Sequence, residues 1–381
     1  MDFALSEEHK MIQESARKFL QNELEPVVDL MEKEEKFPFE VYREAGKLGF
    51  LGPFFPVEYG GGGSDLLTNA IIVEEMTKIN CGFALSVDVS MIYFGYNLLK
   101  QGTEEQKKRY LPPLIKGEKI GCFCLSEPNA GSDALAIQTI ATQNGDFYRI
   151  NGSKIFITNA PISDFFMVVT RTGEREGIKG GTTFILEKGL KGMDVVQMHG
   201  KLGCKSSPTG EIYFDDVVVP KSQILGGQEG RGFIGMMNSL DMERTIAPAL
   251  IIGMAQDCLD RSVAYAKERI QFGQPIAEYQ LIQAKLAEMS IGIEMARTYL
   301  YRLIWMVEQG MNVTKEAAIL KHFSSAMTTK VALEAIQIHG GYGYMEEYRV
   351  ERALRDAKLM EIGGGTNEIQ LLIIARELLK D

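Results

Sequence analysis

The stretch "EIYFDDVVV" (residues 211–219) decides the fold, because it is a β-branched run in a chain whose two ends are patterned as helices. Short alternating or β-branched runs bounded by Gly, Asn and Pro are typical of strands. Similar runs occupy the chain between residues 121 and 225. They are "FYRI" (147–150), "FFMVV" (165–169), "TTFILE" (182–187) and "MDVVQM" (193–198). We therefore predict an antiparallel β domain in the middle of the chain.

Helical periodicity dominates on both sides of this region. In "HKMIQESARKFLQNEL" (residues 9–24) the apolar residues recur at helical spacing, and long patterns of the same kind run from residue 228 onward. Helices this long and few usually pack as an antiparallel bundle. The predicted fold is α+β. Its three domains are an N-terminal α-helical domain (1–120), a middle β domain (121–227) and a C-terminal four-helix bundle (228–381).

Composition excludes several classes of protein. The 381 residues exceed what one core usually serves, and the net charge of −10 without a basic cluster argues against nucleic acid. The N-terminus lacks the pattern of a leader peptide, and no apolar run approaches the roughly 20 residues of a membrane span, so we expect a cytoplasmic protein without membrane insertion. Five scattered cysteines and four histidines favour buried free thiols and predict no metal site.

Local motifs make the domain order specific. They are "CLSEPNAGSDALA" (124–136), "KIFITNA" (154–160), "RIQFGQPI" (269–276), "IQIHGGYGY" (336–344) and "RDAKLMEIGGGTNEIQ" (355–370). Together, in this order and over essentially the whole chain, they resemble the acyl-CoA dehydrogenase family of flavoproteins. The resemblance implies an FAD cofactor, an acyl-CoA substrate, electron-transfer flavoprotein as acceptor, and a homotetramer.

The resemblance also implies where the ligands lie. A Rossmann-type dinucleotide site is disfavoured, because no G-x-G-x-x-G motif follows a strand and opens a helix. Scattered segments would hold FAD instead, with a neighbouring subunit contributing residues 269–272. The implied cofactor-binding residues are Leu125, Ser126, Phe156, Thr158, Arg269, Gln271, Phe272, Gln337, Gly340, Gly341, Thr366 and Glu368. The implied substrate-binding residues are Gly131, Ser132, Asp241, Arg244 and Gly363.

The catalytic base is the point at which this chain departs from most relatives. Dehydrogenation of a thioester needs a carboxylate for the proton next to the carbonyl, and hydrogen-bond donors for the carbonyl oxygen. In most relatives the segment at 363–366 is Tyr-Glu-Gly-Thr and its Glu is the base, whereas here Gly364 stands at that position. The backbone N–H of Gly364 is kept for the carbonyl oxygen, but the carboxylate is lost.

Glu243 in "NSLDMERTIAPAL" (238–250) is the first candidate for the missing base. It matches the L-x-x-E-R motif of the branches that resemble isovaleryl-CoA and long-chain acyl-CoA dehydrogenases, in which a helix carries the base. The alternative is that Glu243 pairs with Arg244 or lies on a solvated helix face. The apolar neighbours Met236, Ile246 and Ala247 argue against it, because an acidic group on a buried helix is costly.

Asp88 in "FALSVDVSMIYFGY" (83–96) is the rival, because an acid between two valines breaks an apolar helical pattern. It aligns with the acyl pocket of relatives. There it would hold a polar acyl group, or act as base on a carbon further from the carbonyl, as suits the alicyclic branch and the 1,4-type dehydrogenation of cyclohex-1-ene-1-carboxyl-CoA. A structural hydrogen bond to neighbouring helix ends is the alternative.

We predict dehydrogenation of a branched or alicyclic acyl-CoA, with Glu243, Asp88 and Gly364 as the catalytic residues. Two other classes stay open. One is a flavin oxidase on the same scaffold, which oxygen consumption would distinguish. The other is a non-catalytic family member, whose flavin would be absent or would not be bleached by any acyl-CoA.

Overall fold

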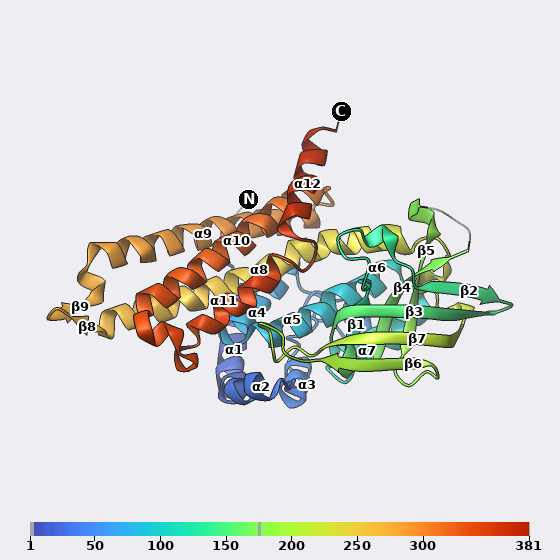
Figure 1. Ribbon diagram of the computed structural model, residues 1–381, viewed down its shortest axis with the longest axis horizontal. Helices are drawn as coiled ribbons and strands as arrows, with labels where there is room; N and C mark the ends of the chain where they lie inside the picture. Colours follow the sequence, from blue (N-terminus) through green and yellow to red (C-terminus); the bar gives the residue numbers. More distant parts are fainter. Residues whose placement is uncertain (1–3, 174–176, 381) are drawn as a thin grey trace.

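The molecule has three parts in the predicted order: helices, a β-sheet, and helices again (Figure 1). The computed structural model describes residues 4–173 and 177–380. In Figure 1 the sheet occupies one end of an elongated molecule and the long C-terminal helices occupy the other, with the N-terminal helices packed below them.

The N-terminal part is built from seven α-helices among the described residues. They are α1 (Glu7–Phe19), α2 (Val28–Glu34), α3 (Phe39–Lys47), α4 (Leu66–Ile79), α5 (Cys81–Asp88), α6 (Asn97–Gln101) and α7 (Glu104–Ile115). A π-helical segment, η4 (Val89–Tyr96), joins α5 to α6. The continuous run Cys81–Gln101 is long and apolar enough to cross a membrane by composition alone, but 78% of its most apolar window is buried inside the protein. It is therefore accounted for as a core helix.

The middle part is a seven-stranded sheet in the order β1-β4-β2-β3-β7-β6, with β5 paired to β4. The strands are β1 (Gly121–Cys124), β2 (Ile140–Asn144), β3 (Phe147–Thr158), β4 (Phe165–Thr172), β5 (Gly181–Glu187), β6 (Met193–Met198) and β7 (Thr209–Pro220). The sheet is mixed rather than wholly antiparallel, because β4 pairs in parallel with both β1 and β2. Long connections between these strands allow this, whereas a tight hairpin turn would force antiparallel pairing.

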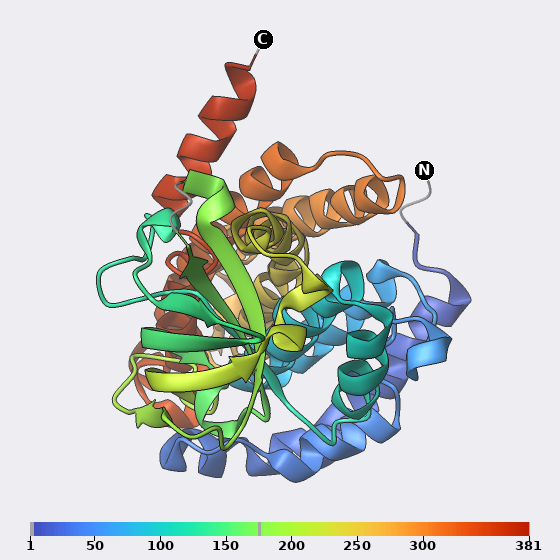
Figure 2. The same cartoon turned by 90° about the vertical axis from the view of Figure 1, so that its right-hand side faces the viewer.

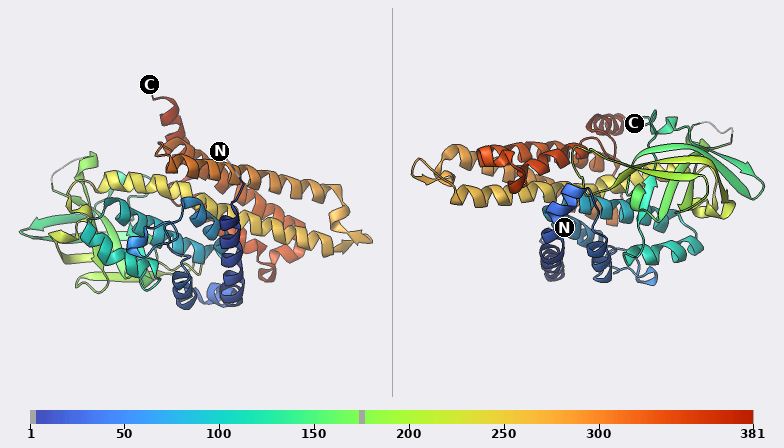
Figure 3. Two further views of the ribbon diagram at one scale, coloured as in Figure 1. Left: turned by 180° about the vertical axis from the view of Figure 1, so that it is seen from behind. Right: turned by 60° about the horizontal axis from the view of Figure 1, so that its bottom comes forward.

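The C-terminal part contains the long helices that the periodicity predicts. They are α8 (Gly232–Glu268), α9 (Gln280–Glu308), α10 (Thr314–His339), α11 (Val350–Met360) and α12 (Asn367–Leu378), with a small hairpin of β8 (Ile270–Gln271) and β9 (Gln274–Pro275) between α8 and α9. Helices α8 to α11 lie side by side, and α12 projects away from the rest of the molecule (Figures 1 and 3). Leucines on α12 are exposed on this projection.

Figure 2 views the molecule from the end that carries the sheet, with N-terminal helices below the sheet and α12 projecting at the top. The three parts contact one another at a buried junction of α5, the β6–β7 connection and α11. There the Sγ atoms of Cys81 on α5 and Cys204 in the β6–β7 connection lie 3.6 Å apart. Asp356 on α11 accepts a hydrogen bond from the backbone N–H of Cys204 at 2.5 Å. Both thiols are free and buried, as the sequence suggests, but their proximity is a tertiary feature that scattered positions did not predict.

Candidate active site

The turn Gly363–Gly365, between α11 and α12, lies directly against Glu243 of α8. Gly364 and Gly365 have φ values of 64° and 91°, in the left-handed region that favours glycine. A Cβ atom on Gly364 would lie 2.6 Å from Oε2 of Glu243 and 2.7 Å from Oε1. The helix carboxylate therefore occupies the space that any side chain at position 364 would enter, which explains in steric terms why an acid stands at one position and glycine at the other.

Glu243 is buried among other polar and charged groups. Its residue is 6% exposed, and its Oε2 atom has no hydrogen-bond partner among the described residues. Burial raises the pKa of Glu243, while Arg244, Lys321 and the Tyr93 hydroxyl each act to lower it. A carboxyl group with a raised pKa and a free oxygen has the properties of a general base.

Asp88 lies in the same buried region, at the junction of α5 and η4. It is 2% exposed, and its Oδ1 atom also lacks a partner among the described residues. Burial raises its pKa well above the usual range, and the charge of Glu243 raises it further. The structure thus brings together the two acids that the sequence offers as rival bases.

Tyr93 on η4 belongs to this cluster, although the sequence did not single it out. Burial raises its pKa, and the charges of Glu243 and then Asp88 raise it further. Its ring stacks on Phe123 of β1, with 5.6 Å between the ring centroids. Ordinary helical periodicity could not place Tyr93, because η4 is π-helical and turns its side chains at a different spacing.

Side chains from three helices bind the carbonyl groups of the glycine turn. The Arg244 Nε donates to the Gly364 oxygen at 3.2 Å, and the Lys321 Nζ donates to the Gly365 oxygen at 2.7 Å. Gln370 donates to the same Gly365 oxygen at 2.8 Å. Lys321 and Gln370 were not among the predicted site residues, since a single Lys or Gln in a helical pattern gives no sequence signal.

Asp241 lies on α8, one helical turn before Arg244. It accepts hydrogen bonds from Arg244 at 3.2 Å and from the Thr314 hydroxyl at 2.7 Å. Arg244 thus links the glycine turn to Asp241. The two predicted substrate residues on α8 are therefore in contact with each other, beside Glu243 in the sequence.

The predicted flavin residues of the sheet adjoin the same face of α8. The backbone oxygen of Leu125 accepts a hydrogen bond from Lys154, and that of Ser126 accepts one from Ile155, both at 2.9 Å. Leu125 packs in the same apolar cluster as Leu240 of α8. The structure therefore places this segment against α8 near Glu243. The buried Lys154 holds the segment there, a role that the sequence did not indicate.

Two further predicted residues lie on β3. Phe156 has a φ of 58° and is 66% exposed, at an irregularity in the pairing of β3 with β7. Thr158 pairs with Thr209 at the end of β3. An exposed ring on a strained backbone is consistent with a ligand or partner covering it. Gly131 and Ser132 are exposed in the preceding connection, where nothing lies within 4 Å of a Cβ built on Gly131.

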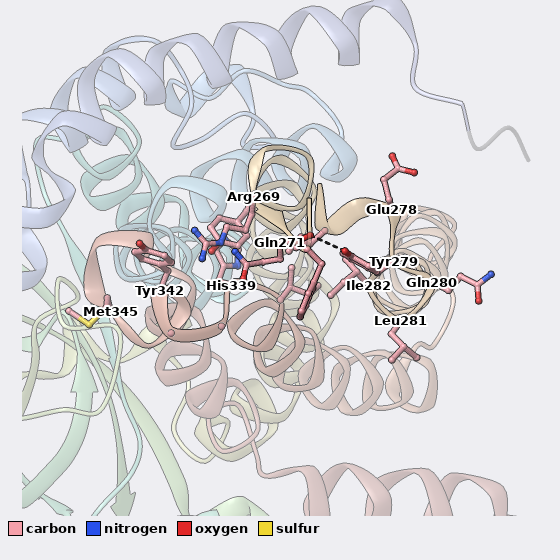
Figure 4. Close-up of a pocket in the computed structure, with 16 residues that line it drawn as sticks. Arg269, Gln271, Glu278, Tyr279, Gln280, Leu281, Ile282, His339, Tyr342 and Met345 are labelled. Atoms are coloured by element: carbon pink, nitrogen blue, oxygen red, sulfur yellow. Dashed lines mark hydrogen bonds between the residues drawn. The ribbon is translucent and has the colours of Figure 1, made fainter. Parts of the chain in front are cut away.

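The second group of predicted cofactor residues forms the wall of a cavity of about 1150 Å³ at the far end of α8 (Figure 4). Its lining includes Arg269, Gln271, Phe272, Gly340 and Gly341. Phe272 is 97% exposed, and nothing lies within 4 Å of a Cβ built on Gly340 or Gly341. A guanidinium, bare glycine backbone and an open aromatic ring fit the phosphates and ring system of a flavin dinucleotide.

Within this cavity, Arg269 lies over the Tyr342 ring at 5.4 Å, and the Tyr279 hydroxyl donates to the Gln271 backbone oxygen at 2.8 Å (Figure 4). The predicted residue Gln337 is exposed on α10 but is not among the residues that line the cavity.

The two groups of cofactor residues do not meet within one chain. Glu243 lies on α8, and Arg269 directly follows the end of this helix, 26 residues further along the chain. At the rise of an α-helix this separation corresponds to about 39 Å. Thr366, which caps α12 through Ile369, and the exposed Glu368 lie instead on the glycine-turn side. One cofactor in contact with both groups would have to be shared between chains.

Comparisons with known proteins show the family of the chain. Sequence models of the acyl-CoA dehydrogenase N-terminal, middle and C-terminal domains match residues 6–118, 122–217 and 230–379. The probable acyl-CoA dehydrogenase YngJ of Bacillus subtilis is 44% identical over 100% of both chains.

Two solved structures superpose over their full length. Butyryl-CoA dehydrogenase from Megasphaera elsdenii has a TM-score of 0.97 at 40% identity, covering 100% of both chains. A chain from a study of the electron-transferring flavoprotein of Acidaminococcus fermentans has a TM-score of 0.97 at 39% identity, also covering 100% of both chains. The present chain therefore belongs to the acyl-CoA dehydrogenase family of FAD-dependent oxidoreductases.

Proposed function

We propose that this enzyme removes hydrogen from the α and β carbons of a branched or alicyclic acyl-CoA thioester with a short acyl chain, and that Glu243 is the base. The observation that carries the proposal is the contact between Glu243 and the glycine turn. The carboxylate lies where a side chain at Gly364 would otherwise stand, so that a helix supplies the acid that the turn lacks.

The residues act on the thioester in a defined way. Glu243 takes the proton from the α carbon, and the Gly364 N–H donates a hydrogen bond to the thioester oxygen as negative charge develops there. The electron pair of the broken α C–H bond forms the new double bond, and a hydride leaves the β carbon. A bound FAD, held by the cofactor-binding residues named above, would supply the acceptor for this hydride.

The acyl group is proposed to be compact and wide rather than long. Gly363 carries no side chain, and within 4 Å of a Cβ built on it lie only atoms of Leu359, which leaves space at the turn for a branch or a ring. The buried carboxyl group of Asp88 disfavours a long apolar tail, since such a tail offers it no hydrogen-bond partner. The butyryl substrate named for the Megasphaera relative is of similar length.

Asp88 as the base is the second candidate, and one observation favours it. Its carboxyl group is buried beside Glu243 and makes no recorded hydrogen bond to a described residue, so that its role is unexplained by packing. Against it, the charge of Glu243 adds to burial in raising the pKa of Asp88, and no cation among the described residues opposes this rise. Arg244 and Lys321 stabilise the ionised form of Glu243, which makes Glu243 the better candidate.

The proposed assembly is a homotetramer, and the proposed electron acceptor is an electron-transfer flavoprotein. The separation of the two cofactor-binding groups along α8 supports an FAD site shared between subunits. The Acidaminococcus study supports the acceptor, because it concerns an electron-transferring flavoprotein.

The decisive experiment is anaerobic flavin reduction by butyryl-CoA, isovaleryl-CoA, cyclohexanecarboxyl-CoA and cyclohex-1-ene-1-carboxyl-CoA. The native enzyme is compared with Glu243→Gln and Asp88→Asn, and Glu288→Gln on the exposed face of α9 is the control. We expect Glu243→Gln to slow flavin reduction at least about 1000-fold, because loss of a general base removes that order of rate, with the branched or ring substrates fastest in the native enzyme.

Three results would contradict the proposal. If Asp88→Asn alone abolishes flavin reduction and the ring substrates are preferred, Asp88 is the base. If butyryl-CoA reduces the flavin far faster than every branched or ring substrate does, the proposed acyl group is wrong. Rapid oxygen consumption during turnover would assign the enzyme to the oxidases instead.

A further inference from the structure

Lys321 is a buried cation whose position neither packing nor ion pairing explains. It lies on α10 and is 2% exposed. Its Nζ donates to the Gly365 oxygen at 2.7 Å and lies 3.5 Å from the Asn367 Oδ1, and no carboxylate oxygen among the described residues is recorded within 4 Å of it. A buried ammonium without an ion pair is costly, so its contacts with the glycine turn call for a function.

The glycine turn needs external support because it has little of its own. Three consecutive glycines lose more conformational freedom on ordering than any other residues would. Apart from Lys321, the recorded donors to the Gly364 and Gly365 oxygens are Arg244 and Gln370. Lys321 is the donor that comes from α10, so it ties the turn to a helix outside both α8 and α12.

The charges around Lys321 connect it to Glu243. Burial lowers the pKa of Lys321 to about 8, with Arg244 acting in the same direction and Glu243 opposing it. Glu361 and Glu368 also act to raise this pKa. Since a pKa of about 8 lies above neutral pH, Lys321 remains positively charged there.

The effect on Glu243 follows from the groups that face it. Asp88 of α5 and Tyr93 of η4 interact with it electrostatically from the N-terminal part, and Arg244 and Lys321 do so from α8 and α10. Of these groups, Arg244 and Lys321 are the cations, and both favour the ionised form of Glu243. Arg244 also forms an ion pair with Asp241, which offsets part of the positive charge of Arg244. Lys321 has no ion pair among the described residues.

We propose that Lys321 is a positioning residue of the dehydrogenation: it fixes the glycine turn at the thioester oxygen and keeps Glu243 in its ionised, proton-accepting form. The inference rests on the proposed role of Glu243 as base. It extends that role, because the positive charge that keeps Glu243 ionised comes from Lys321 on a different helix.

The test measures the rate of anaerobic flavin reduction against pH for three substitutions. Lys321→Arg keeps both donor and charge, Lys321→Gln keeps a donor without charge, and Lys321→Met removes both. Lys330→Met, on the exposed face of the same helix, is the matched control. Loss of the cation raises the pKa of Glu243. In the Gln and Met variants we therefore expect the acid limb of the pH–rate profile to shift to higher pH by about one unit.

Separate readouts distinguish the two functions of Lys321. Lys321→Arg should keep the acid limb of the native pH–rate profile. Lys321→Met should in addition lower the rate on the pH plateau at least tenfold, because the turn is then less well fixed. Flavin content and thermal midpoint establish that each variant is folded. If Lys321→Met fails to fold, the comparison of Gln with Arg still decides the electrostatic part.

The outcomes separate this inference from the proposed function. If Glu243→Gln retains rapid flavin reduction, the proposed base is wrong whatever the Lys321 variants do. If Glu243→Gln is inactive but the Gln and Met variants of Lys321 keep the native acid limb and plateau rate, the role of Lys321 is refuted and that of Glu243 stands.

Discussion

Gly364 is the residue at which the sequence departs from most relatives, and the structure gives this departure a steric meaning. Its φ of 64° disfavours any side chain, and a Cβ there would contact both carboxylate oxygens of Glu243. The sequence alone predicted the exchange of a turn acid for a helix acid, because both positions lie in recognisable motifs. It could not predict the contact, since 121 residues separate the two positions.

We therefore expect Gly364→Ala to slow flavin reduction about 100-fold or more, because displacement of a catalytic group by as little as 1 Å has this effect. Gly189→Ala is the matched control, since Gly189 has a φ of 89° but nothing within 4 Å of its Cβ. It should cost about 1–2 kcal/mol of stability from backbone strain alone and leave the rate of flavin reduction unchanged. Equal rates for the native enzyme and Gly364→Ala would refute the steric argument.

At the scale of elements, α5 and η4 determine where the second acid and Tyr93 lie. Asn80 begins α5, because its Oδ1 accepts the Phe83 N–H at 2.7 Å and the Ser206 hydroxyl at 2.8 Å. The same asparagine donates to Glu32 at 2.8 Å. The helical pattern predicted a helix here, but the π-helical geometry of η4 and its effect on Tyr93 were not accessible from periodicity.

We expect Asn80→Ala to cost about 1 kcal/mol or more through loss of the helix cap and also to slow flavin reduction severalfold, since α5 and η4 would shift beside Glu243. Thr103→Ala removes the cap of α7 and should lower the thermal midpoint by a similar amount without slowing the reaction. The two variants are compared by thermal unfolding and by anaerobic flavin reduction. If they slow the reaction equally, the position of α5 does not matter for catalysis.

At the scale of the whole molecule, the two groups of predicted cofactor-binding residues lie far apart along the direction of α8. Phe272 is almost fully exposed beside the large cavity, and exposed leucines occupy the projecting α12. Apolar groups of this size in the open are typical of surfaces that a partner covers. The resemblance to the family predicted a neighbouring subunit at residues 269–272, and the distances along α8 support it.

We expect Phe272→Asp to disrupt the proposed subunit contact, so that the protein sediments as a smaller species and loses most of its flavin on gel filtration. Val196→Asp, at an exposed position on β6, is the control and should leave both properties unchanged. Sedimentation velocity and the ratio of flavin to protein absorbance are the measurements. Full flavin retention by a monomeric Phe272→Asp would show that the FAD site is complete within one chain.

The order of helices, sheet and helices and the family were determined by the sequence alone, because periodicity and motif identity are local properties. For the same reason the sequence alone led to the hypothesis that Glu243 replaces the acid missing at position 364. The parallel pairing of β4, the proximity of Asp88 to Glu243, the junction of Cys81 with Cys204, and the support of the glycine turn by Lys321 were decided only by the tertiary structure. These are contacts between side chains distant along the chain. Their geometry depends on how whole elements pack, which no local pattern encodes.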